Sequence, residues 1–233
     1  MKKIFLLTLL AALTAAPGLS QSLPWPAESL NPDSYGYTWK TNDAPGGPQY
    51  NWIEIVTNGL GTEVLGMGDD DFKGPFQLGF DFQYYWVTRS EIYIGSNGYL
   101  AFEPGNIAST AIGFPKTPTN SSPNDVIAPF MCDLSPTGPG NPGRIFYYAD
   151  TDNERFIVTW YQMPFWTNNA SGWDGLNTFQ AILDGQDSTI TFQYQFQVGQ
   201  WNAGYNDAPY PMVVGIENLL GTVGLFVIDD VAP

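Results

Sequence analysis

The chain has 233 residues, no histidine, one cysteine, and 8 Lys+Arg against 23 Asp+Glu, which gives a formal net charge of −15. The lack of histidine excludes Ser-His and Cys-His nucleophilic pairs and histidine-bearing zinc sites, and a single cysteine excludes an internal disulfide. Lys and Arg supply most of a protein's affinity for nucleic acid, and a chain this acidic is therefore not expected to bind nucleic acid. The 43% hydrophobic content predicts a folded core.

The N-terminus has the organisation of an export signal. Two lysines precede an apolar run over residues 4–16, which is too short to span a bilayer comfortably. Gly18 and Ser20 are small residues, and they occupy the −3 and −1 positions of an expected cleavage between Ser20 and Gln21. We therefore expect residues 1–20 to be a signal peptide and Gln21 to begin the exported chain.

Export defines where the protein is expected to act. Loss of the two lysines leaves six basic residues against 23 acidic ones, so the formal charge becomes −17. No second long apolar run follows, and we expect no transmembrane helix in the mature chain. The mature protein is expected to be secreted or held at the cell surface, with the bacterial periplasm as the alternative compartment. After a Pro-rich leader over residues 21–34, one domain is expected over residues 35–230.

The remaining sequence indicates short strands joined by turns. Residues 188–196 alternate apolar and polar side chains, which predicts a strand with one buried and one solvated face. The run 178–183 precedes this strand, and the Asp-Gly-Gln-Asp sequence at residues 184–187 predicts a hairpin turn between them. Three more hairpins are predicted, about residues 96–98, 150–153 and 218–221. The Asn97-Gly98 pair is typical of a type I′ turn. This pattern predicts an all-β fold, an antiparallel β-sandwich of jelly-roll-like architecture.

Several of these segments carry motifs in a characteristic order. A Phe-rich run over residues 76–82 precedes the hairpin sequence Ile-Tyr-Ile-Gly-Ser-Asn-Gly-Tyr-Leu-Ala-Phe over residues 92–102. Further stretches follow in the same order at residues 127–134, 145–148, 156–160, 177–183 and 190–194. Together they resemble the nidogen-like extracellular domain, from about residue 76 to residue 226. The resemblance implies an extracellular, non-catalytic module of the adhesion or matrix type, with no catalytic residues.

Two acidic segments are candidates for a calcium site. Asp69, Asp70 and Asp71 form the densest cluster, and Asp150 and Asp152 alternate along a predicted turn. Calcium prefers several carboxylate oxygens, but neither segment has the EF-hand spacing. A solvated loop explains the first segment and hairpin geometry explains the second. No cofactor is expected apart from a weakly bound Ca²⁺ at one of these clusters.

Two connections that combine large rings with polar side chains are the better ligand candidates. Their residues are Trp166, Asn168, Asn169, Trp173, Trp201 and Tyr205. Aromatic faces stack on sugar rings and anchor protein interfaces, and side-chain amides bond polar groups of either ligand. The alternative is that these rings fold back over a sheet edge. The aromatic residues within predicted strands are expected in the core, and they are Trp39, Trp52, Trp160, Phe179, Phe192 and Tyr194.

Catalysis is not expected. A glycoside hydrolase needs only two carboxylates and suits a histidine-free β-sandwich, yet none of the seven glutamates lies in an alternating acidic pattern. Glu217, the most notable of them, is expected to be a strand-end carboxylate that faces water. We therefore expect a non-catalytic binding or adhesion module that recognises an extracellular protein or glycan through aromatic and polar loops. The alternatives are a carbohydrate-binding domain, a polysaccharide-active hydrolase, and a structural part of a larger cell-surface assembly.

Overall fold

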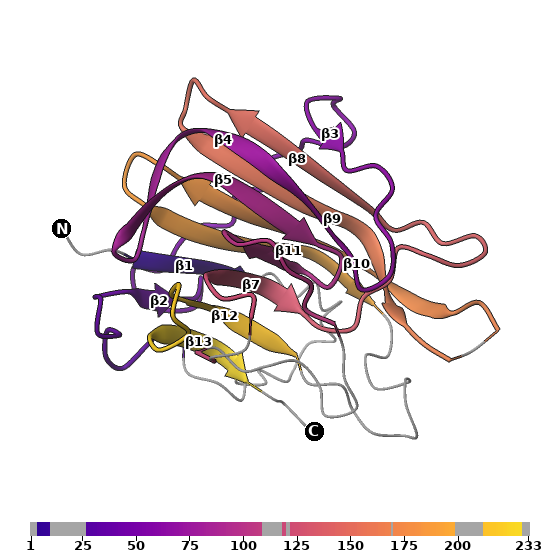
Figure 1. Ribbon diagram of the computed structural model, residues 1–233. Helices are drawn as coiled ribbons and strands as arrows, with labels where there is room; N and C mark the ends of the chain where they lie inside the picture. The colour runs from indigo at the N-terminus through magenta and orange to yellow at the C-terminus, as the bar shows by residue number, and fades with distance from the viewer. Residues whose placement is uncertain are drawn as a thin grey trace.

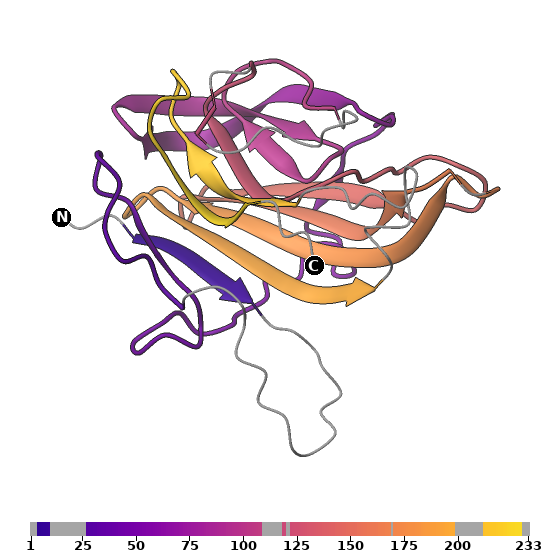
Figure 2. The same cartoon turned by 90° about the horizontal axis from the view of Figure 1, so that it is seen from below.

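The computed structural model describes residues 4–9, 27–108, 118–119, 122–168, 170–198 and 212–229. Within these residues every regular element is a strand, and the strands form two sheets that pack face to face (Figure 1, Figure 2). The expected all-β sandwich is confirmed. Among the same residues, no helix is long and apolar enough to cross a membrane.

Seven strands form one sheet, here called sheet A, and six form the other, called sheet B. In spatial order sheet A contains β2 (Thr38–Lys40), β1 (Ile4–Leu9), β11 (Thr189–Val198), β10 (Trp173–Asp184), β9 (Arg155–Trp166), β8 (Arg144–Asp150) and β3 (Thr62–Glu63). Sheet B contains β13 (Gly224–Asp229), β12 (Val213–Glu217), β7 (Val126–Met131), β6 (Tyr99–Ala101), β5 (Val87–Gly95) and β4 (Phe72–Tyr84). The pairings are antiparallel except those of β1, which lies parallel to both β2 and β11. β1 falls within the segment expected to be the signal peptide.

All four predicted hairpins form, and polar turn residues close them. The pairs are β5–β6, β8–β9, β10–β11 and β12–β13. In the β10–β11 turn, the Asp184 carboxylate accepts the N–H of Gln186 at 3.0 Å, and the Asp187 carboxylate accepts the N–H of Thr189 at 3.0 Å. Asp and Asn are favoured in such turns because their side chains bond the backbone two residues ahead. The hairpins are therefore set by local sequence.

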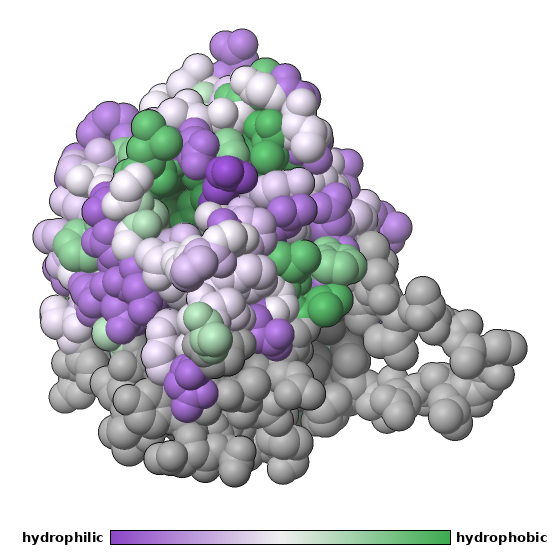
Figure 3. All heavy atoms as spheres, turned by 90° about the vertical axis from the view of Figure 1, so that its right-hand side faces the viewer, coloured by the Kyte–Doolittle hydropathy of each residue, from purple (hydrophilic) through white to green (hydrophobic). Residues whose placement is uncertain are grey.

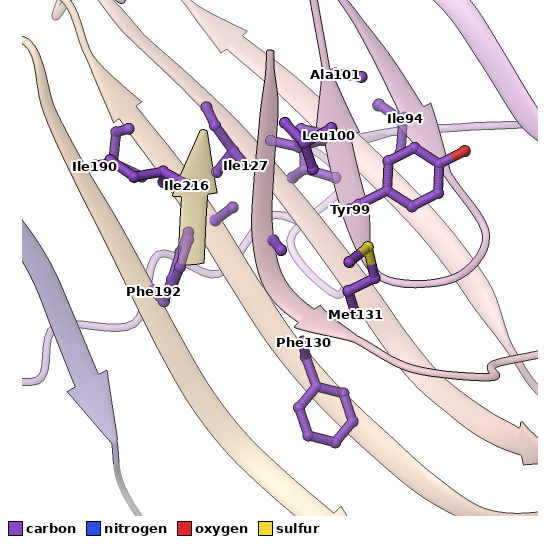
Figure 4. Packing of buried hydrophobic residues seen from close by; sticks show 14 of the residues in the cluster. Ile94, Tyr99, Leu100, Ala101, Ile127, Phe130, Met131, Ile190, Phe192 and Ile216 are labelled. Carbon is purple, nitrogen blue, oxygen red and sulfur yellow. The ribbon is translucent and has the colours of Figure 1, made fainter. Parts of the chain in front are cut away.

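The core lies between the two sheets. Ile190 and Phe192 from sheet A are fully buried and lie close to Ile127 and Ile216 from sheet B (Figure 4). Their alternation along β11 is the one predicted from sequence. The predicted core aromatics Trp39, Trp160, Phe179, Phe192 and Tyr194 are all buried.

Buried rings also join the two sheets by hydrogen bonds. The indole Nε1 of Trp160 in β9 donates to the Gly95 carbonyl in β5 at 3.0 Å. The hydroxyl of Tyr194 in β11 donates to the Pro129 carbonyl in β7 at 2.5 Å. Each of these two rings thus contributes apolar area and also satisfies its own polar atom. These bonds fix how sheet A sits on sheet B.

An extended segment crosses the other face of sheet A. Gln193 of β11 accepts the N–H of Asn51 at 2.8 Å and donates to the Asn51 carbonyl at 2.9 Å. Gln180 of β10 donates to the Ile53 carbonyl at 2.9 Å. Two neighbouring glutamines thereby bond alternate residues of the segment, which satisfies backbone groups that no sheet partner reaches.

Trp52 is the exception among the predicted core aromatics. It belongs to this surface segment instead of to a strand, and its side chain is only half-buried. Its ring stacks on that of Tyr50, with the centroids 6.5 Å apart and an interplanar angle of 22°. The expectation that Trp52 lies in the core is therefore wrong.

Candidate functional site

The two tryptophans of the first predicted ligand loop meet at the tip of the β9–β10 hairpin. Trp166 is the last residue of β9 and Trp173 the first of β10, and the two are direct cross-strand partners. Both are half-buried, and Asn168 beside them is exposed. Cross-strand partners have their Cβ atoms about 5 Å apart, so the register places these two side chains side by side. The tip projects from one end of the sandwich (Figure 1).

A neighbouring loop supports this tip. The indole Nε1 of Trp173 donates to the Pro139 carbonyl at 3.2 Å. A Cβ atom added at Gly138 would lie 2.5 Å from the Ser171 carbonyl oxygen and 3.0 Å from the Trp173 ring, so only glycine fits there. The Pro/Gly-rich loop over residues 136–143 therefore supports Trp173.

The same tip is attached to the end of β7. The N–H of Trp166 donates to the Asp133 carbonyl at 2.9 Å, and the N–H of Ser135 donates to the Pro164 carbonyl at 3.1 Å. Leu134 forms an isolated antiparallel bridge with Phe165. The aromatic tip and residues 133–135 thus form one connected structure.

A cluster of three acidic side chains, which includes Asp133, lies next to this structure. Oxygen atoms from the carboxylates of Asp69, Asp70 and Asp133 all lie within 4.8 Å of one another. Asp69 is exposed, Asp70 half-buried and Asp133 buried. Desolvation, and after it the negative charge of Asp70, raises the pKa of Asp69. Three oxygens at this spacing could ligate one hard divalent cation, which would relieve their mutual repulsion.

Asn97 holds this acidic cluster in place. Its Nδ2 donates to the Asp70 carboxylate at 2.6 Å and to the Ile107 carbonyl at 3.0 Å. Its Oδ1 accepts the N–H of Leu134 at 3.0 Å. The side chain therefore joins three separate segments, and it is fully buried. Sequence reasoning had assigned Asn97 only to a turn.

The β5–β6 turn is not of type I′. That turn needs positive φ at both central residues, and of the pair only Gly98 has it, at 73°. Gly98 is required for a second reason, because an added Cβ would lie 2.1 Å from the Phe130 carbonyl oxygen. The prediction fails because Gly95 pairs with Tyr99, so the connection has three residues, and a three-residue hairpin loop places its positive-φ residue last, here Gly98.

The other predicted calcium ligands have local partners. The Asp71 carboxylate accepts a hydrogen bond from Lys73 Nζ at 2.6 Å and another from the N–H of Gly68 at 2.9 Å. The Asp150 carboxylate accepts hydrogen bonds from Asn153 Nδ2 at 2.9 and 2.8 Å, and Asp152 is exposed on the same turn. Among the described residues, the acidic group that could hold a cation is Asp69, Asp70 and Asp133.

Three predicted ligand residues, Asn169, Trp201 and Tyr205, lie outside the described residues. Of the predicted set, the structure brings together Trp166 and Trp173, and it adds Asp133, which the sequence reasoning did not select. Figure 3 shows the face on this side of the molecule, where apolar residues lie in separate groups among hydrophilic ones.

Glu217 does not face water. Its side chain is buried, and its carboxylate accepts the N–H of Thr119 at 2.7 Å. Burial, followed by the charge of Asp125, raises the pKa of Glu217 to about 8. The expectation of a solvated carboxylate is wrong because residues 118–119 lie over the end of β12 and occupy the place of water.

Asp125 completes this buried acidic pair. It is paired with Arg89, whose Nη2 contacts the Asp125 carboxylate, and the Asp125 side chain is 1% exposed. Burial raises the pKa of Asp125 to about 6, although the Arg89 charge opposes the shift. Both side chains are 1% exposed, and the partners of their carboxylates are Arg89 and the N–H of Thr119.

These features define a β-sandwich module in which two half-buried tryptophan rings and a cluster of acidic side chains lie on the connections at one end. Residues 47–229 match the family described as NIDO related, and the chain belongs to this family. The predicted resemblance to nidogen-like domains is thereby confirmed.

Two curated relatives are similar to this chain. Nidogen-2 of Mus musculus is 25% identical over 168 residues, which are 58% of this chain and 11% of the relative. Alpha-tectorin of Gallus gallus is 26% identical over 152 residues, which are 54% of this chain and 7% of the relative. The matched region is thus a small part of either relative. No solved structure matches the chain.

Proposed function

We propose that the chain is an extracellular, non-catalytic binding module that recognises a protein or glycan through the β9–β10 tip. The observation that carries this proposal is the cross-strand pairing of Trp166 with Trp173 beside the acidic cluster. Membership of the NIDO-related family supports an adhesion or matrix role. The much greater length of nidogen-2 and alpha-tectorin supports the further idea that such a module works within a larger assembly.

The geometry of the tip suits recognition. Trp rings supply large contact areas at a low cost in conformational entropy, and binding hot spots are enriched in Trp. The bond from Trp173 to Pro139 holds one ring before any ligand arrives, which lowers the cost of ordering it. The exposed amide of Asn168 can bond sugar hydroxyls or a partner backbone.

Binding by the purified chain from Gln21 onward tests this proposal. A glycan array and a panel of purified extracellular matrix proteins are probed with the parent protein and with Trp166→Ala and Trp173→Ala. Each variant is expected to bind at least about tenfold more weakly, as for a central aromatic anchor. Trp86→Ala is the matched control, because Trp86 is 59% exposed at a different turn, between β4 and β5. Equal binding by all four proteins would contradict a role for the tip.

The proposal includes export of the chain with removal of residues 1–20. Mass spectrometry of the protein recovered from outside the producing cell is expected to find Gln21 at the N-terminus. Recovery of a chain that begins at Met1 would contradict the cleavage and leave the binding test of the tip unaffected.

Calcium binding at Asp69, Asp70 and Asp133 is a second candidate function, favoured by the convergence of their oxygens within 4.8 Å. An ion at this position would lie next to the aromatic tip, because the Asp133 carbonyl accepts the N–H of Trp166. Calcium would then stiffen the recognition surface. The enzymatic alternative is tested by zymography on a polysaccharide panel, where we expect no clearing.

A further inference from the structure

An open cavity lies on the face of sheet A that points away from sheet B. Its volume is about 300 Å³, and it lies between the extended segment over residues 48–53 and side chains of β9, β10 and β11. Arg155, at the start of β9, lines this cavity, whereas the tip residue Trp166 is at the other end of the same strand (Figure 1). The length of β9 separates the two residues by roughly 35 Å. The cavity is therefore a site separate from the aromatic tip.

The walls of the cavity are held in place by bonds between distant segments. The side-chain amides of Gln180 and Gln193 attach the segment 48–53 to sheet A. The N–H of Gly185 donates to the Glu154 carbonyl at 2.7 Å, which joins the β8–β9 and β10–β11 turns beside the cavity. A preformed cavity costs less to occupy than one that a ligand must first order.

One ion pair lies in the wall of the cavity. Arg155 and Asp184 are cross-strand partners, and Arg155 Nε lies 3.4 Å from the Asp184 carboxylate. The two side chains are 36% and 26% exposed, so both still present polar atoms to the solvent. An anion in the cavity would meet Asp184, and a cation would meet Arg155. The pair therefore favours a neutral ligand that both donates and accepts hydrogen bonds.

Most of the described residues that line the cavity are polar. Thr189 and Thr191 line it from alternate positions of β11, and Ile190 between them is buried in the core. Side chains at alternate positions of a strand lie about 7 Å apart on one face, a span that one sugar ring can bridge. Ile53 and Ile182 supply a small apolar area, which suits the C–H face of such a ring. Pockets for apolar ligands are lined mainly by apolar side chains, so this cavity does not suit them.

We infer that this cavity binds one neutral sugar unit. Arg155 donates hydrogen bonds to the sugar hydroxyls, Asp184 accepts hydrogen bonds from them, and the threonine hydroxyls do either. The volume of about 300 Å³ is at the lower end of the range for ligand pockets, as expected for a single ring. The inference goes beyond the proposed role of the tip, because this site lies at the other end of the strands.

NMR of the purified protein with labelled isoleucine methyl groups tests the inference. The probes are the methyl glycosides of glucose, galactose, mannose and N-acetylglucosamine, with glucuronate as the anionic comparison. At least one neutral sugar is expected to shift the methyl resonances of Ile53 and Ile182, with a Kd on the order of 1 mM, as for a ligand of so few atoms. The methyl resonances of Ile94, which is buried in sheet B, are expected to stay in place.

A matched pair of substitutions checks the contact. Thr191→Val removes one hydroxyl and keeps the shape of the side chain. It is expected to weaken binding of that sugar about fivefold, because one hydrogen bond to the ligand is lost. Thr88→Val is the control, since Thr88 is exposed on β5 in the other sheet, and it should bind the sugar as the parent does. Equal affinity of the parent and Thr191→Val would overturn the inference.

The remaining outcomes distinguish the cavity from the tip. A sugar that shifts the indole N–H resonances of Trp166 and Trp173, but not the methyl resonances of Ile53 and Ile182, would support the tip and overturn the inference. Binding of glucuronate without binding of any neutral sugar would also overturn it, since the cavity would then be an anion site. If no sugar shifts Ile53 and Ile182, the inference fails, while the binding tests with Trp166→Ala and Trp173→Ala stand unchanged.

Discussion

The acidic residues of this protein occupy two contrasting environments. At one end of the sandwich, carboxylate oxygens of Asp69, Asp70 and Asp133 converge within 4.8 Å next to the aromatic tip, and Asp69 opens this cluster to solvent. Under residues 118–119, Asp125 and Glu217 are buried, one against Arg89 and the other against the N–H of Thr119. The same chemical group therefore serves two purposes.

The difference lies in what neutralises each group. A buried carboxylate must have a cation, a hydrogen bond or a proton, because an uncompensated charge in the interior is costly. Asp125 has the cation, and Glu217 has the hydrogen bond and a pKa raised to about 8. The surface cluster is solvated in part, so it can remain charged and attract an ion. Predictions that alter either group test this contrast.

The largest effect is expected from Arg89→Met. Methionine keeps packing against Phe102, over whose ring the guanidinium lies at 5.7 Å, but it leaves Asp125 without its cation. The free energy of unfolding is expected to fall by about 3 kcal/mol at pH 8, and by less at pH 5, where a proton can neutralise Asp125. Urea denaturation at the two pH values measures both.

Arg144→Met is the matched control for that substitution. Arg144 pairs with Glu63 at 3.3 Å, but its side chain is 55% exposed. Water screens this pair, so its loss is expected to change stability by less than about 1 kcal/mol. An equal loss in the two variants would show that burial of Asp125 does not set the cost.

A smaller effect of opposite sign is expected from Glu217→Gln. The pKa of Glu217 rises from 4.5 to about 8 on folding, so between these values the folded protein holds a proton that the unfolded chain releases. Stability therefore falls as pH rises from about 4.5 to about 8. The amide cannot ionise, and its oxygen still accepts the N–H of Thr119. The variant is expected to be at least about 1 kcal/mol more stable than the parent at pH 9.

Denaturation midpoints at pH 5 and pH 9 measure this difference. The two proteins are expected to be close at pH 5 and to separate at pH 9. Glu91→Gln, at an exposed position on β5, is the control and should follow the parent at both values. If the stability of the parent relative to Glu217→Gln rose between pH 5 and pH 9, the raised pKa of Glu217 would be contradicted.

These contrasts also show what sequence reasoning could reach. The hairpins were predictable because alternation and turn residues such as Asp184 and Asp187 act over a few neighbouring positions. The sequence places Trp166 and Trp173 in one connection between two predicted strands. In the structure these two residues are cross-strand partners. The hydrogen bond from Trp173 to the Pro139 carbonyl supports this pairing, and Pro139 is remote from both residues in sequence.

Tertiary placement accounts for what was missed. Asp133 joins Asp69 and Asp70 only because Asn97 and the end of β7 bring their segments together. Glu217 sits on a strand whose pattern does not reveal that Thr119 will cover it. Both misses concern which distant segment lies over a polar group, and one sequence carries little information about such contacts.

The surface half of the contrast depends on a cation at Asp69, Asp70 and Asp133. If calcium binds there, free calcium tenfold above its Kd stabilises the folded protein by about 1.4 kcal/mol, which corresponds to a rise in Tm of roughly 4 °C. Asp70→Asn is expected to abolish the rise. Asn tolerates the φ of 46° at this position, and its oxygen can still accept from Asn97 Nδ2, so the loop should keep its shape.

Asp152→Asn provides the comparison, since Asp152 is exposed on the β8–β9 turn and lies outside the cluster. Differential scanning calorimetry in millimolar calcium and in chelator should give the same rise for this variant as for the parent. If Asp152→Asn abolished the rise in Tm and Asp70→Asn did not, the ion would bind instead at the other predicted acidic segment, which carries Asp150 and Asp152. No rise in the parent would mean that the surface carboxylates act through solvation alone, and the aromatic rings would then be the whole of the recognition site.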